Sequence, residues 1–284
     1  MLLRKLTDEI EGLRGLDCVA RGAAGVVSRV TRPDVIKNAL SGTWLGHPLH
    51  PMLTDVPIGA WSMASVLDVT AGRAGAASAR RLVGVGLIAS VPAAWTGASD
   101  WSDTYGAPRR VGLVHALLNV TASGMQLASL CARRRGRRGV GMLLTGAGLC
   151  VTGCSAYLGG HLSLVRGVGV NHTAFQGTVD EWTDVAAESD VVDDGPFRTT
   201  AGGVPVMIVR HRGALYALSA TCTHAGGPLD EGEVVRDSCI RCPWHGSEFR
   251  LKDGRVTRGP AAVDEPRWDV KADGGRVYVK SATR

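Results

Sequence analysis

Two short runs of cysteine and histidine in this 284-residue chain have the residue types and spacing of metal ligands. The first run is Cys222-Thr-His224, and the second, after seventeen intervening residues, is Cys242-Pro-Trp-His245. Two thiolates on one iron and two neutral imidazoles on the other can hold a [2Fe–2S] cluster, and the imidazoles raise its reduction potential above that of an all-cysteine cluster. The pattern therefore predicts one-electron redox chemistry.

Glycines and a proline accompany these ligands. Gly226-Gly227 and Gly246 follow the two histidines and can bring backbone N–H groups close to a buried sulfide. With Arg258-Gly-Pro-Ala261, which is similar to the proline loop that covers the cluster, they make residues 178–284 resemble the Rieske [2Fe–2S] domain. The resemblance implies an all-β domain whose iron ligands are Cys222, His224, Cys242 and His245.

The sequence departs from one branch of that family. Rieske proteins of respiratory complexes carry two extra cysteines that clamp the ligand loops with a disulfide, and Gly227 and Trp244 stand at those positions here. The sequence therefore resembles Rieske ferredoxins and oxygenase domains more than the quinol-oxidising subunit of a cytochrome bc complex. Ser247 stands where a hydroxyl can hydrogen-bond a sulfide, and Phe249 replaces a tyrosine that would do the same. We expect an intermediate reduction potential.

Zinc is the alternative occupant of these ligands. Mixed sets of cysteine and histidine bind structural zinc, and Cys239-Ile-Arg-Cys242 is itself a C-x-x-C pair. A zinc site accounts for the four ligands but for neither the flanking glycines nor the proline loop. We expect Cys239 to be a buried strand residue.

The sequence of the N-terminal half predicts a membrane domain. The hydrophobic fraction of 45% does not reveal it, because that value averages two unlike halves of the chain. Four apolar stretches with almost no lysine or arginine each approach the roughly 20 residues that a bilayer-spanning helix needs. They are residues 51–70, 82–98, 111–132 and 140–160. The short connections between them predict two antiparallel hairpins.

The predicted fold class is thus an N-terminal all-α four-helix transmembrane bundle followed by a C-terminal all-β Rieske domain. Alternating runs at 204–209, 214–218 and 276–280 predict strands in the second part. The predicted domains are an amphipathic segment on the membrane surface at 1–46, the membrane domain at 47–161, a tether at 162–177 and the Rieske domain at 178–284.

Histidines gather at one end of the predicted bundle. His47 and His50 precede the first span within Gly-His-Pro-Leu-His-Pro, His115 lies near the start of the third, and His161 ends the fourth. Because successive spans alternate in direction, all fall at the membrane face from which the β domain emerges. A haem b or metal site held by His50, His115 and His161 is one interpretation, and histidines that only hydrogen-bond neighbouring helices are the other. The motif and the four spans resemble an uncharacterised bacterial membrane family found fused to Rieske domains.

The remaining patterns favour an electron carrier. The chain has no D-x2-H-x4-H iron triad, no glycine-rich dinucleotide fingerprint and no C-x-x-C-H haem attachment, so no substrate-transforming site is predicted. Its net charge of +6 lies at the flanks of the spans and in Arg133–Arg138, which argues against nucleic acid as a partner.

We therefore expect a membrane-anchored protein that relays single electrons through the cluster, to or from a haem or quinone in the bundle. The alternatives are a tethered ferredoxin that serves a separate reductase or oxygenase, and a redox-sensing membrane protein. The expected partners are the lipid bilayer and a redox protein or quinone, in a multi-pass protein of a bacterial cell membrane. Arginines in the connections at 71–81 and 133–139 slightly favour these loops as cytoplasmic and the cluster on the outer face. The lack of a disulfide clamp instead suits a reducing cytoplasm, so the side of the membrane stays open.

Overall fold

The computed structural model describes residues 2–283 and divides the chain into two compact units. The helical unit contains the residues up to Arg32 and Leu49–Val168. The β unit contains Pro33–Pro48 and the residues from Gly169 onward. The chain therefore passes between the units at three points, after Arg32, after Pro48 and after Val168.

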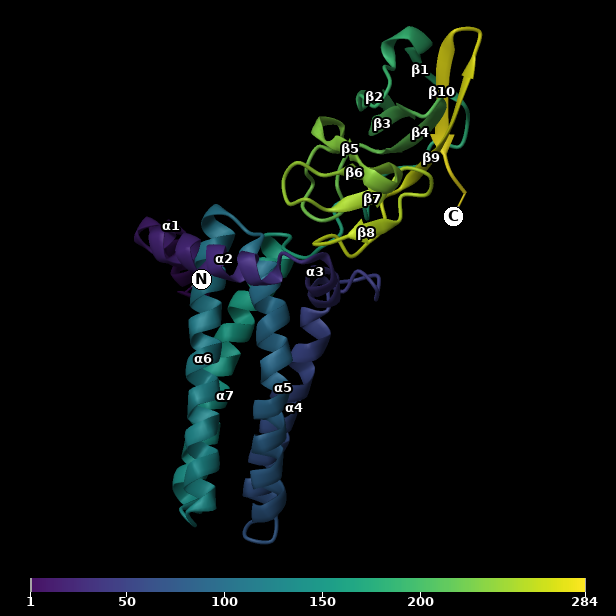
Figure 1. Ribbon diagram of the computed structural model, residues 1–284. Coiled ribbons are helices and arrows are strands. Elements are labelled where there is room, and N and C mark those ends of the chain that lie inside the picture. The colour runs from purple at the N-terminus through teal and green to yellow at the C-terminus, as the bar shows by residue number, and fades with distance from the viewer. Residues whose placement is uncertain (1, 284) are drawn as a thin grey trace. The chain divides into compact units, whose positions relative to one another are not determined.

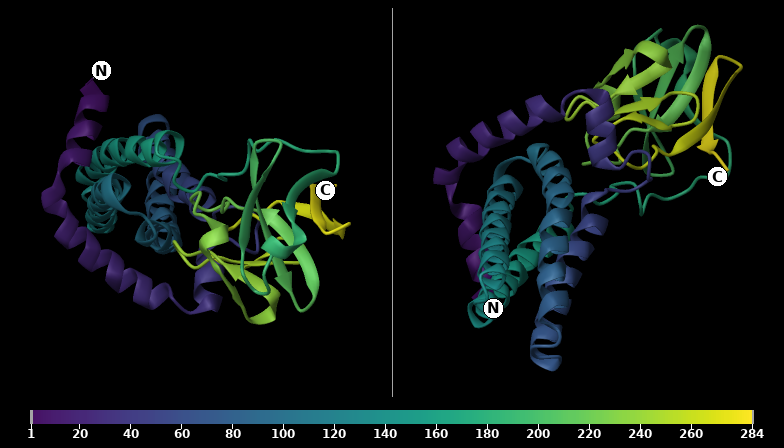
Figure 2. Two further views of the ribbon diagram at one scale, coloured as in Figure 1. Left: turned by 90° about the horizontal axis from the view of Figure 1, so that it is seen from above. Right: turned by 60° about the horizontal axis from the view of Figure 1, so that its bottom comes forward.

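Four long helices form the body of the helical unit. They are α4 (His50–Thr70), α5 (Ala76–Ser102), α6 (Gly106–Arg134) and α7 (Arg138–Gly160), and α7 continues into the π-helical turn η2 (His161–Val165). They run side by side as two antiparallel hairpins (Figures 1 and 2). Their bounds enclose all four stretches that the hydropathy of the sequence singled out.

Three helical segments are long and apolar enough to cross a membrane: Ala76–Ser102, Gly106–Arg134 and Arg138–Val165. Helix α4 is not among them, so four transmembrane helices, as predicted from the sequence, are not confirmed. Helix α4 carries the carboxylates Asp55 and Asp68. Charged groups lower the suitability of a helix for lipid.

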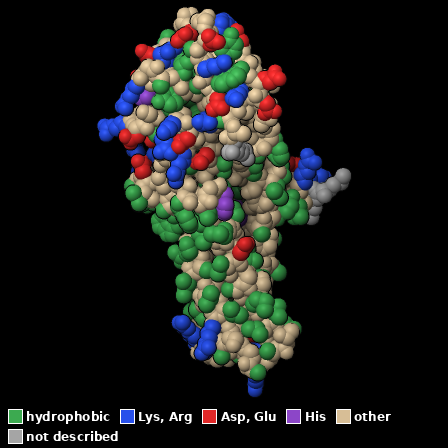
Figure 3. All heavy atoms as spheres, turned by 90° about the vertical axis from the view of Figure 1, so that its right-hand side faces the viewer, with side chains coloured by type: hydrophobic (Ala, Val, Ile, Leu, Met, Phe, Trp, Pro, Cys, Tyr) green, Lys and Arg blue, Asp and Glu red, His purple; other side chains and the backbone are tan. Residues whose placement is uncertain are grey.

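The helical unit buries small and polar side chains and exposes apolar ones. Its buried polar residues include Thr96, Gln126, Ser129, Thr145, Thr152 and Ser155. Its exposed residues include Ile88, Val91, Leu117, Val120, Leu127 and Leu143. On the face drawn in Figure 3, hydrophobic side chains are scattered along the helices, and lysine and arginine gather at the end with the α4–α5 and α6–α7 turns. Helices that associate in lipid pack in this way, because small residues allow close approach and polar ones bond across the interface.

The N-terminal region of the helical unit is also helical. It consists of α1 (Leu2–Gly12), the 3-10 turn η1 (Arg14–Leu16) and α2 (Asp17–Thr31). Arg110 on α6 holds it in two places, donating to the Glu11 backbone oxygen at 2.7 Å and to the Asp17 carboxylate at 2.9 Å.

The β unit contains two antiparallel sheets. The larger has the order β1-β10-β9-β4-β3-β2, formed by Thr183–Ala187, Arg276–Ser281, Arg267–Asp273, Ala214–Ser219, Val204–His211 and Phe197–Ala201. The smaller has the order β5-β6-β7-β8, formed by Glu233–Val235, Cys239–Arg241, Glu248–Arg250 and Val256–Arg258. The short 3-10 turns η3 (Glu188–Asp190), η4 (Leu229–Glu231) and η5 (Arg236–Ser238) connect strands. All three strands expected from the sequence are present, within β3, β4 and β10.

One helix, α3 (Asp34–Ser41), packs on strand β8 in the β unit (Figure 1). The sequence had placed this segment with the surface helices at 1–46. Gly42, in the left-handed region at φ +78°, ends α3, and the chain then returns to the helical unit after Pro48.

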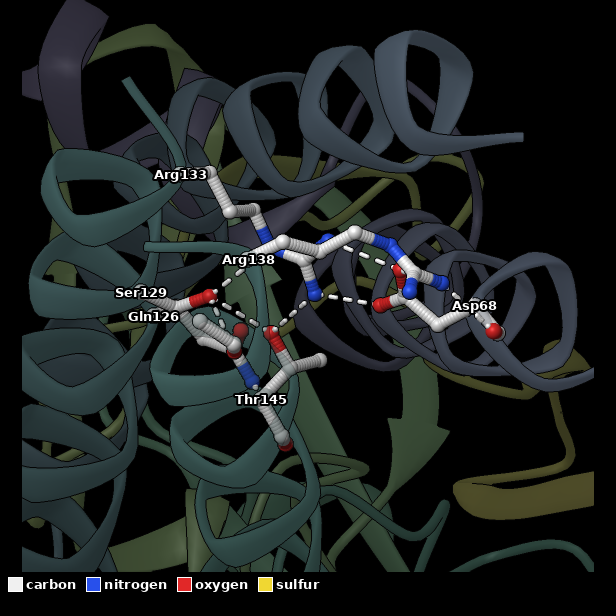
Figure 4. A network of polar contacts seen from close by, with 7 residues as sticks. Asp68, Gln126, Ser129, Arg133, Arg138 and Thr145 are labelled. Atoms are coloured by element: carbon white, nitrogen blue, oxygen red, sulfur yellow. Dashed lines mark hydrogen bonds and ion pairs between the residues drawn. The ribbon is translucent and has the colours of Figure 1, made fainter. Parts of the chain in front are cut away.

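A buried ion-pair network joins α4, α6 and α7 near the α6–α7 turn (Figure 4). Arg133 Nη1 donates to Asp68 Oδ1 at 3.0 Å, and Nη2 makes a second bond to Oδ2. Arg138 Nη2 donates to the Asp68 backbone oxygen at 2.7 Å. Ser129 and Thr145 accept further bonds from Arg133, at 3.1 and 3.3 Å. The side chains of Arg133 and Asp68 are 3% and 2% exposed, so the pair holds α4 against the other hairpin without help from water.

This network weakens the inference that the arginine-rich α6–α7 turn is cytoplasmic. Of the five arginines at 133–139, Arg133 and Arg138 bind Asp68, whereas Arg134, Arg135 and Arg137 are exposed. The charge that favoured a cytoplasmic position for this turn is thus partly committed to packing.

We predict that Asp68→Asn destabilises the helical unit by about 3 to 5 kcal/mol, because it leaves the buried Arg133 charge without its counter-ion. Thermal unfolding of the detergent-purified chain, followed by circular dichroism, measures this loss. The double variant Asp68→Asn/Arg133→Met should recover most of it, and the exposed neighbour Arg134→Met serves as the control. Equal stability of the single and double variants would contradict a paired network.

Candidate iron–sulfur site

The two ligand loops share one backbone design. In the first, the Cys222 N–H donates to Gly227 O at 2.8 Å, and the Gly226 N–H donates to Cys222 O at 2.9 Å. The Cys242 loop repeats both bonds, at the same offsets along the chain, with lengths of 2.8 and 3.1 Å. The glycine four residues after each cysteine has φ of +75° or +74°, a conformation that side chains disfavour. Each loop is therefore a tight turn that the sequence dictates through its cysteine-to-glycine spacing.

Short strands hold these loops at one end of the smaller sheet. The first loop lies between β4 and β5 and is closed by a bridge between Thr221 and Pro228. The second loop connects β6 to β7, whose register pairs Arg241 with Glu248. The Gly259-Pro260 loop follows β8 directly. Three chain segments distant in sequence thus meet around the four candidate ligands.

The ligand side chains form a sulfur pair and an imidazole pair. Cys222 and Cys242 are 1% and 2% exposed, and their thiols lie within hydrogen-bonding distance of each other. The rings of His224 and His245 meet edge to face, with centroids 4.9 Å apart, and both residues are partly exposed. A pair of buried thiols beside a pair of partly exposed histidines matches a cluster with one sulfur-ligated and one nitrogen-ligated iron.

The electrostatics suit metal binding. The hydrogen bond from Cys222, supported by the backbone N–H groups of Trp244 and His245, lowers the pKa of Cys242 to about 7 against the opposing effect of burial. The pKa of Cys222 is raised, by its bond to Cys242 and then by burial. Burial lowers the pKa of His224 to about 3, so its ring is neutral at pH 7. One thiolate forms readily and the imidazole is unprotonated, as iron ligation requires.

The residues fit a bound cluster. The Nδ1 atom of His224 is buried and has no hydrogen-bond partner among the described residues. A buried nitrogen in that state carries a desolvation penalty, which a bond to iron would remove. Together with the facing thiols, this atom indicates a place for a metal rather than a finished protein core.

Ser247 connects the second loop to the proline loop. Its side chain is fully buried, and its Oγ accepts the Ala261 N–H at 2.9 Å. Because the oxygen acts as acceptor in that bond, its own O–H proton can be donated elsewhere. The hydrogen bond from Ser247 to a sulfide stays a prediction. Phe249, on β7, is fully buried and offers no such donor.

Trp244 covers the position where the respiratory family members have a disulfide. A Cβ atom added to Gly227 would lie 3.0 Å from Trp244 Cδ2 and 3.1 Å from Cys242 Sγ. The indole therefore packs against the first loop through the glycine backbone, and a side chain at Gly227 would push it away. Trp244 is nevertheless 53% exposed, so part of the ring faces solvent.

Glu265 fastens the first loop from behind. Its Oε2 accepts the Thr223 N–H at 3.1 Å, and Thr223 Oγ1 donates to Val263 O at 2.8 Å. Complete burial raises the pKa of Glu265 well above its usual range, and the charge of Cys242 raises it further. The sequence pattern gave no indication of this residue, because its role depends on a contact across about forty positions.

Cys239 lies in β6 and is 2% exposed. Its Sγ is 3.6 Å from Thr257 Oγ1 on β8. It is a buried strand residue, as expected.

The segment around α3 also reaches the site. Asn38 Oδ1 accepts the Gly259 N–H at 2.9 Å, and Asn38 Nδ2 donates to Thr257 O at 3.1 Å. Lys37, the preceding residue, is 5% exposed. The sequence analysis identified neither residue. Pro33 and the Gly46-His-Pro run were the available signals, because they interrupt the helical pattern on either side of this segment.

The membrane histidines are each held separately. His50 Nδ1 bonds to Ala93 O at 2.9 Å, and His115 Nδ1 bonds to Ser155 O at 2.8 Å. His161 Nε2 is instead 2.9 Å from the Glu11 carboxylate, which also pairs with Arg166. His50 and His115 are close enough to interact electrostatically. Among the described residues, no three His, Cys, Asp or Glu side chains gather as ligands of a single metal ion.

Two sequence families match different parts of the chain. The model of the family described as Rieske [2Fe-2S] domain matches residues 181–272. The model described as predicted membrane protein (DUF2231) matches residues 46–172. Residues 33–45, which include α3, lie outside both matches.

Individual relatives resemble the β unit. The ferredoxin CarAc of Metapseudomonas resinovorans is 34% identical over 100 residues, which are 34% of this chain and 92% of that protein. The apoptosis-inducing factor 3 of Homo sapiens is 34% identical over 92 residues, but the chain spans only 15% of its length. The solved ferredoxin of carbazole 1,9a-dioxygenase from Nocardioides aromaticivorans IC177 is 30% identical, with a TM-score of 0.35 over 36% of this chain and 100% of that one.

We predict that Gly246→Ala lowers the content of iron and acid-labile sulfide per chain. The left-handed backbone there costs a side chain about 1 to 2 kcal/mol, and the new Cβ would lie 2.9 Å from Arg258 Nη1. The control is Gly274→Ala, which has φ of +55° but open space around it and lies in the β9–β10 turn. Equal losses in both variants would mean that general destabilisation, not the ligand loop, causes the effect.

Proposed function

This chain belongs to the Rieske family of [2Fe–2S] proteins, and on that basis we propose that it is a membrane-bound carrier that accepts and donates one electron at a time. When bound, the cluster supplies the redox couple. The protein buries Cys222 and Cys242, which keeps the sulfur side away from water, and leaves His224 and His245 partly exposed. The observation that carries the proposal is the pairing of two buried, facing thiols with two histidines whose rings meet edge to face.

The surface beside the imidazoles suits a transient protein contact. Pro243 and Trp244, between the second cysteine and histidine, are both exposed. An aromatic residue at the edge of a redox site can pack against a partner without a large buried interface, as short-lived electron-transfer complexes require. We place the exchange of electrons with a separate redox protein here.

Relatives suggest the class of that partner. Besides the ferredoxin CarAc, similar proteins include the anthranilate 1,2-dioxygenase ferredoxin subunit of Burkholderia cepacia, 27% identical over 104 residues. The second name describes a ferredoxin that is a subunit of a dioxygenase. A reductase or oxygenase is thus the leading candidate for the partner of this chain.

A haem b or quinone in the helical unit is the second candidate, favoured by the tautomers of two histidines. A carbonyl oxygen can only accept, so the bonds of His50 to Ala93 O and of His115 to Ser155 O put the protons on Nδ1. Each Nε2 then carries the lone pair that a metal would need, although the Asn119 amide lies 3.1 Å from that atom of His115. His161, engaged by Glu11, would have to exchange that partner to join such a site.

The connection from the helical unit to the first ligand loop is short. Val168 ends the helical unit, and the His172 N–H donates to Thr223 O at 3.1 Å. Four residues of chain span at most about 14 Å. The first ligand loop is therefore tethered to Val168 by a short stretch of chain. We place the protein in a bacterial cell membrane with the cluster, from the arginine distribution, on its outer face.

The proposal is tested with the full-length chain purified in detergent. Anaerobic reduction should bleach the visible absorption of the cluster by one electron per chain, and an oxidant should restore it. Cys222→Ser and Cys242→Ser should abolish both the absorption and the bound sulfide. Stoichiometric zinc in place of iron and sulfide, or a cluster that cannot be reduced reversibly, would reject the electron carrier.

Replacement of His115 separates the two candidate partners. If a haem is bound, His115→Ala should remove its sharp reduced bands while leaving the cluster absorption intact, because the two sets of ligands belong to different units. His161→Ala tests the third histidine, and the exposed His47→Ala is the control. Absence of haem bands in the wild-type chain expressed with added haem would leave the tethered ferredoxin, with the histidines as packing residues.

A further inference from the structure

One amide of helix α3 binds the start of the proline loop. Asn38 Oδ1 accepts the Gly259 N–H at 2.9 Å, and Asn38 Nδ2 donates to Thr257 O at 3.1 Å. The residues that these bonds join are more than two hundred positions apart in the chain. Because the amide uses one acceptor and one donor, it fixes both the position of this backbone and the direction of its peptide groups.

Close packing accompanies the two bonds. A Cβ atom added to Gly259 would lie 3.2 Å from Ser41 Cβ and 3.3 Å from Thr43 Cγ2. The lack of a side chain at Gly259 therefore allows the end of α3 and the residues after it to approach the loop. The proline loop is thus packed against a segment that lies outside the part of the chain matched by the Rieske family model.

The same loop is bonded, on the other side of Pro260, to the second ligand loop. The Ala261 N–H donates to Ser247 Oγ at 2.9 Å, and Ser247 is fully buried. Proline has no N–H of its own, so the loop offers one donor before Pro260 and one after it. Asn38 of α3 binds the first, and Ser247 binds the second. A displacement of the loop at Gly259 would therefore disturb the bond that holds the Ser247 hydroxyl.

A second connection from α3 reaches the residue before Ser247. Arg258 Nε donates to Asp34 Oδ1 of α3, and Arg258 Nη1 donates to Gly246 O, both at 2.6 Å. The N–H groups of a planar guanidinium have fixed directions, so the bond to Asp34 orients the bond to the Gly246 carbonyl. The two connections converge on Ser247, one through Ala261 and the other through Gly246.

We propose that Asn38 is a positioning residue of the electron-transfer site. By anchoring the proline loop to α3, it holds the Ser247 hydroxyl in the orientation that donates to a cluster sulfide, and it thereby raises the reduction potential. The proposal rests on the function above, since it requires the four ligands to hold a [2Fe–2S] cluster.

The physical reason is the change of charge on reduction. An added electron makes the sulfides more negative, so a hydrogen bond donated to one of them stabilises the reduced cluster more than the oxidised one. A serine side chain has several rotamers and its hydroxyl proton rotates, so the proton keeps one direction only while the oxygen is held. The Ala261 N–H holds that oxygen, and Asn38 keeps the loop of Ala261 in place. Because the Asn38 side chain is uncharged, its replacement changes the potential through geometry.

The test is a double-variant cycle on the midpoint potential of the full-length chain, measured by redox titration of the cluster absorption. Ser247→Ala should lower the potential, and Asn38→Ala should lower it by a smaller amount, with iron and sulfide content unchanged. The double variant should have the potential of Ser247→Ala alone, because no hydroxyl is left to position. Val35→Ala, which shortens an 83% exposed side chain of the same helix, is the matched control and should leave the potential unchanged.

Asn38→Leu protects the test from a packing artefact, since it removes both bonds but keeps a side chain of similar size. It should lower the potential as Asn38→Ala does. An unchanged potential in both Asn38 variants, or in Ser247→Ala, with full cluster content would overturn the proposal. Equal shifts from Asn38→Ala with and without the Ser247 hydroxyl would do so as well, because they would assign the effect to altered solvent access.

Cluster content separates the remaining outcomes. Loss of the cluster from both Asn38 variants or from Ser247→Ala would overturn the proposal, since these residues would then be needed to bind the cluster and not to set its potential. A wild-type chain without a reducible cluster would instead refute the proposed function.

Discussion

The structure of the β unit depends on one constraint: two thiols and two imidazoles, carried by two separate loops, must be brought together. The backbone meets it with the same turn used twice. In each turn the cysteine carbonyl accepts the N–H of a glycine four positions on, and the glycine adopts a positive φ. The thiols of Cys222 and Cys242 thereby lie within hydrogen-bonding distance of each other, and the rings of His224 and His245 meet edge to face. The sheets, the proline loop and Glu265 all act to keep these two turns in place.

The helical unit solves a different problem, since it buries many polar side chains and exposes many apolar ones. In a lipid environment no hydrophobic force would press the helices together, so close packing and polar bonds must do so. The buried pair of Arg133 and Asp68 is one of these bonds and joins one hairpin to the other. The pair places a charge within each of two largely apolar helices.

Much of this could be predicted from the sequence, for reasons that differ between features. The ligand loops are local, so four residues and their glycines were enough to predict both turns and the metal chemistry. The helices followed from apolar length, and β3, β4 and β10 from alternation. Glu265 could not be found, because a single carboxylate in a loop has no pattern that reveals a partner forty positions away. The buried pair of Asp68 and Arg133 escaped notice for the same reason.

The position of the segment at 33–48 could not be predicted from the sequence. Its amphipathic composition suits a membrane surface, and its few anchoring residues are polar ones that occur in any exposed helix. What assigns α3 to the β unit is complementarity: the amide of Asn38 matches one donor and one acceptor on neighbouring residues, and Asp34 matches Arg258. Neither set of hydrogen bonds can be predicted from the sequence of α3 alone, because each depends on which residues of the β unit lie opposite.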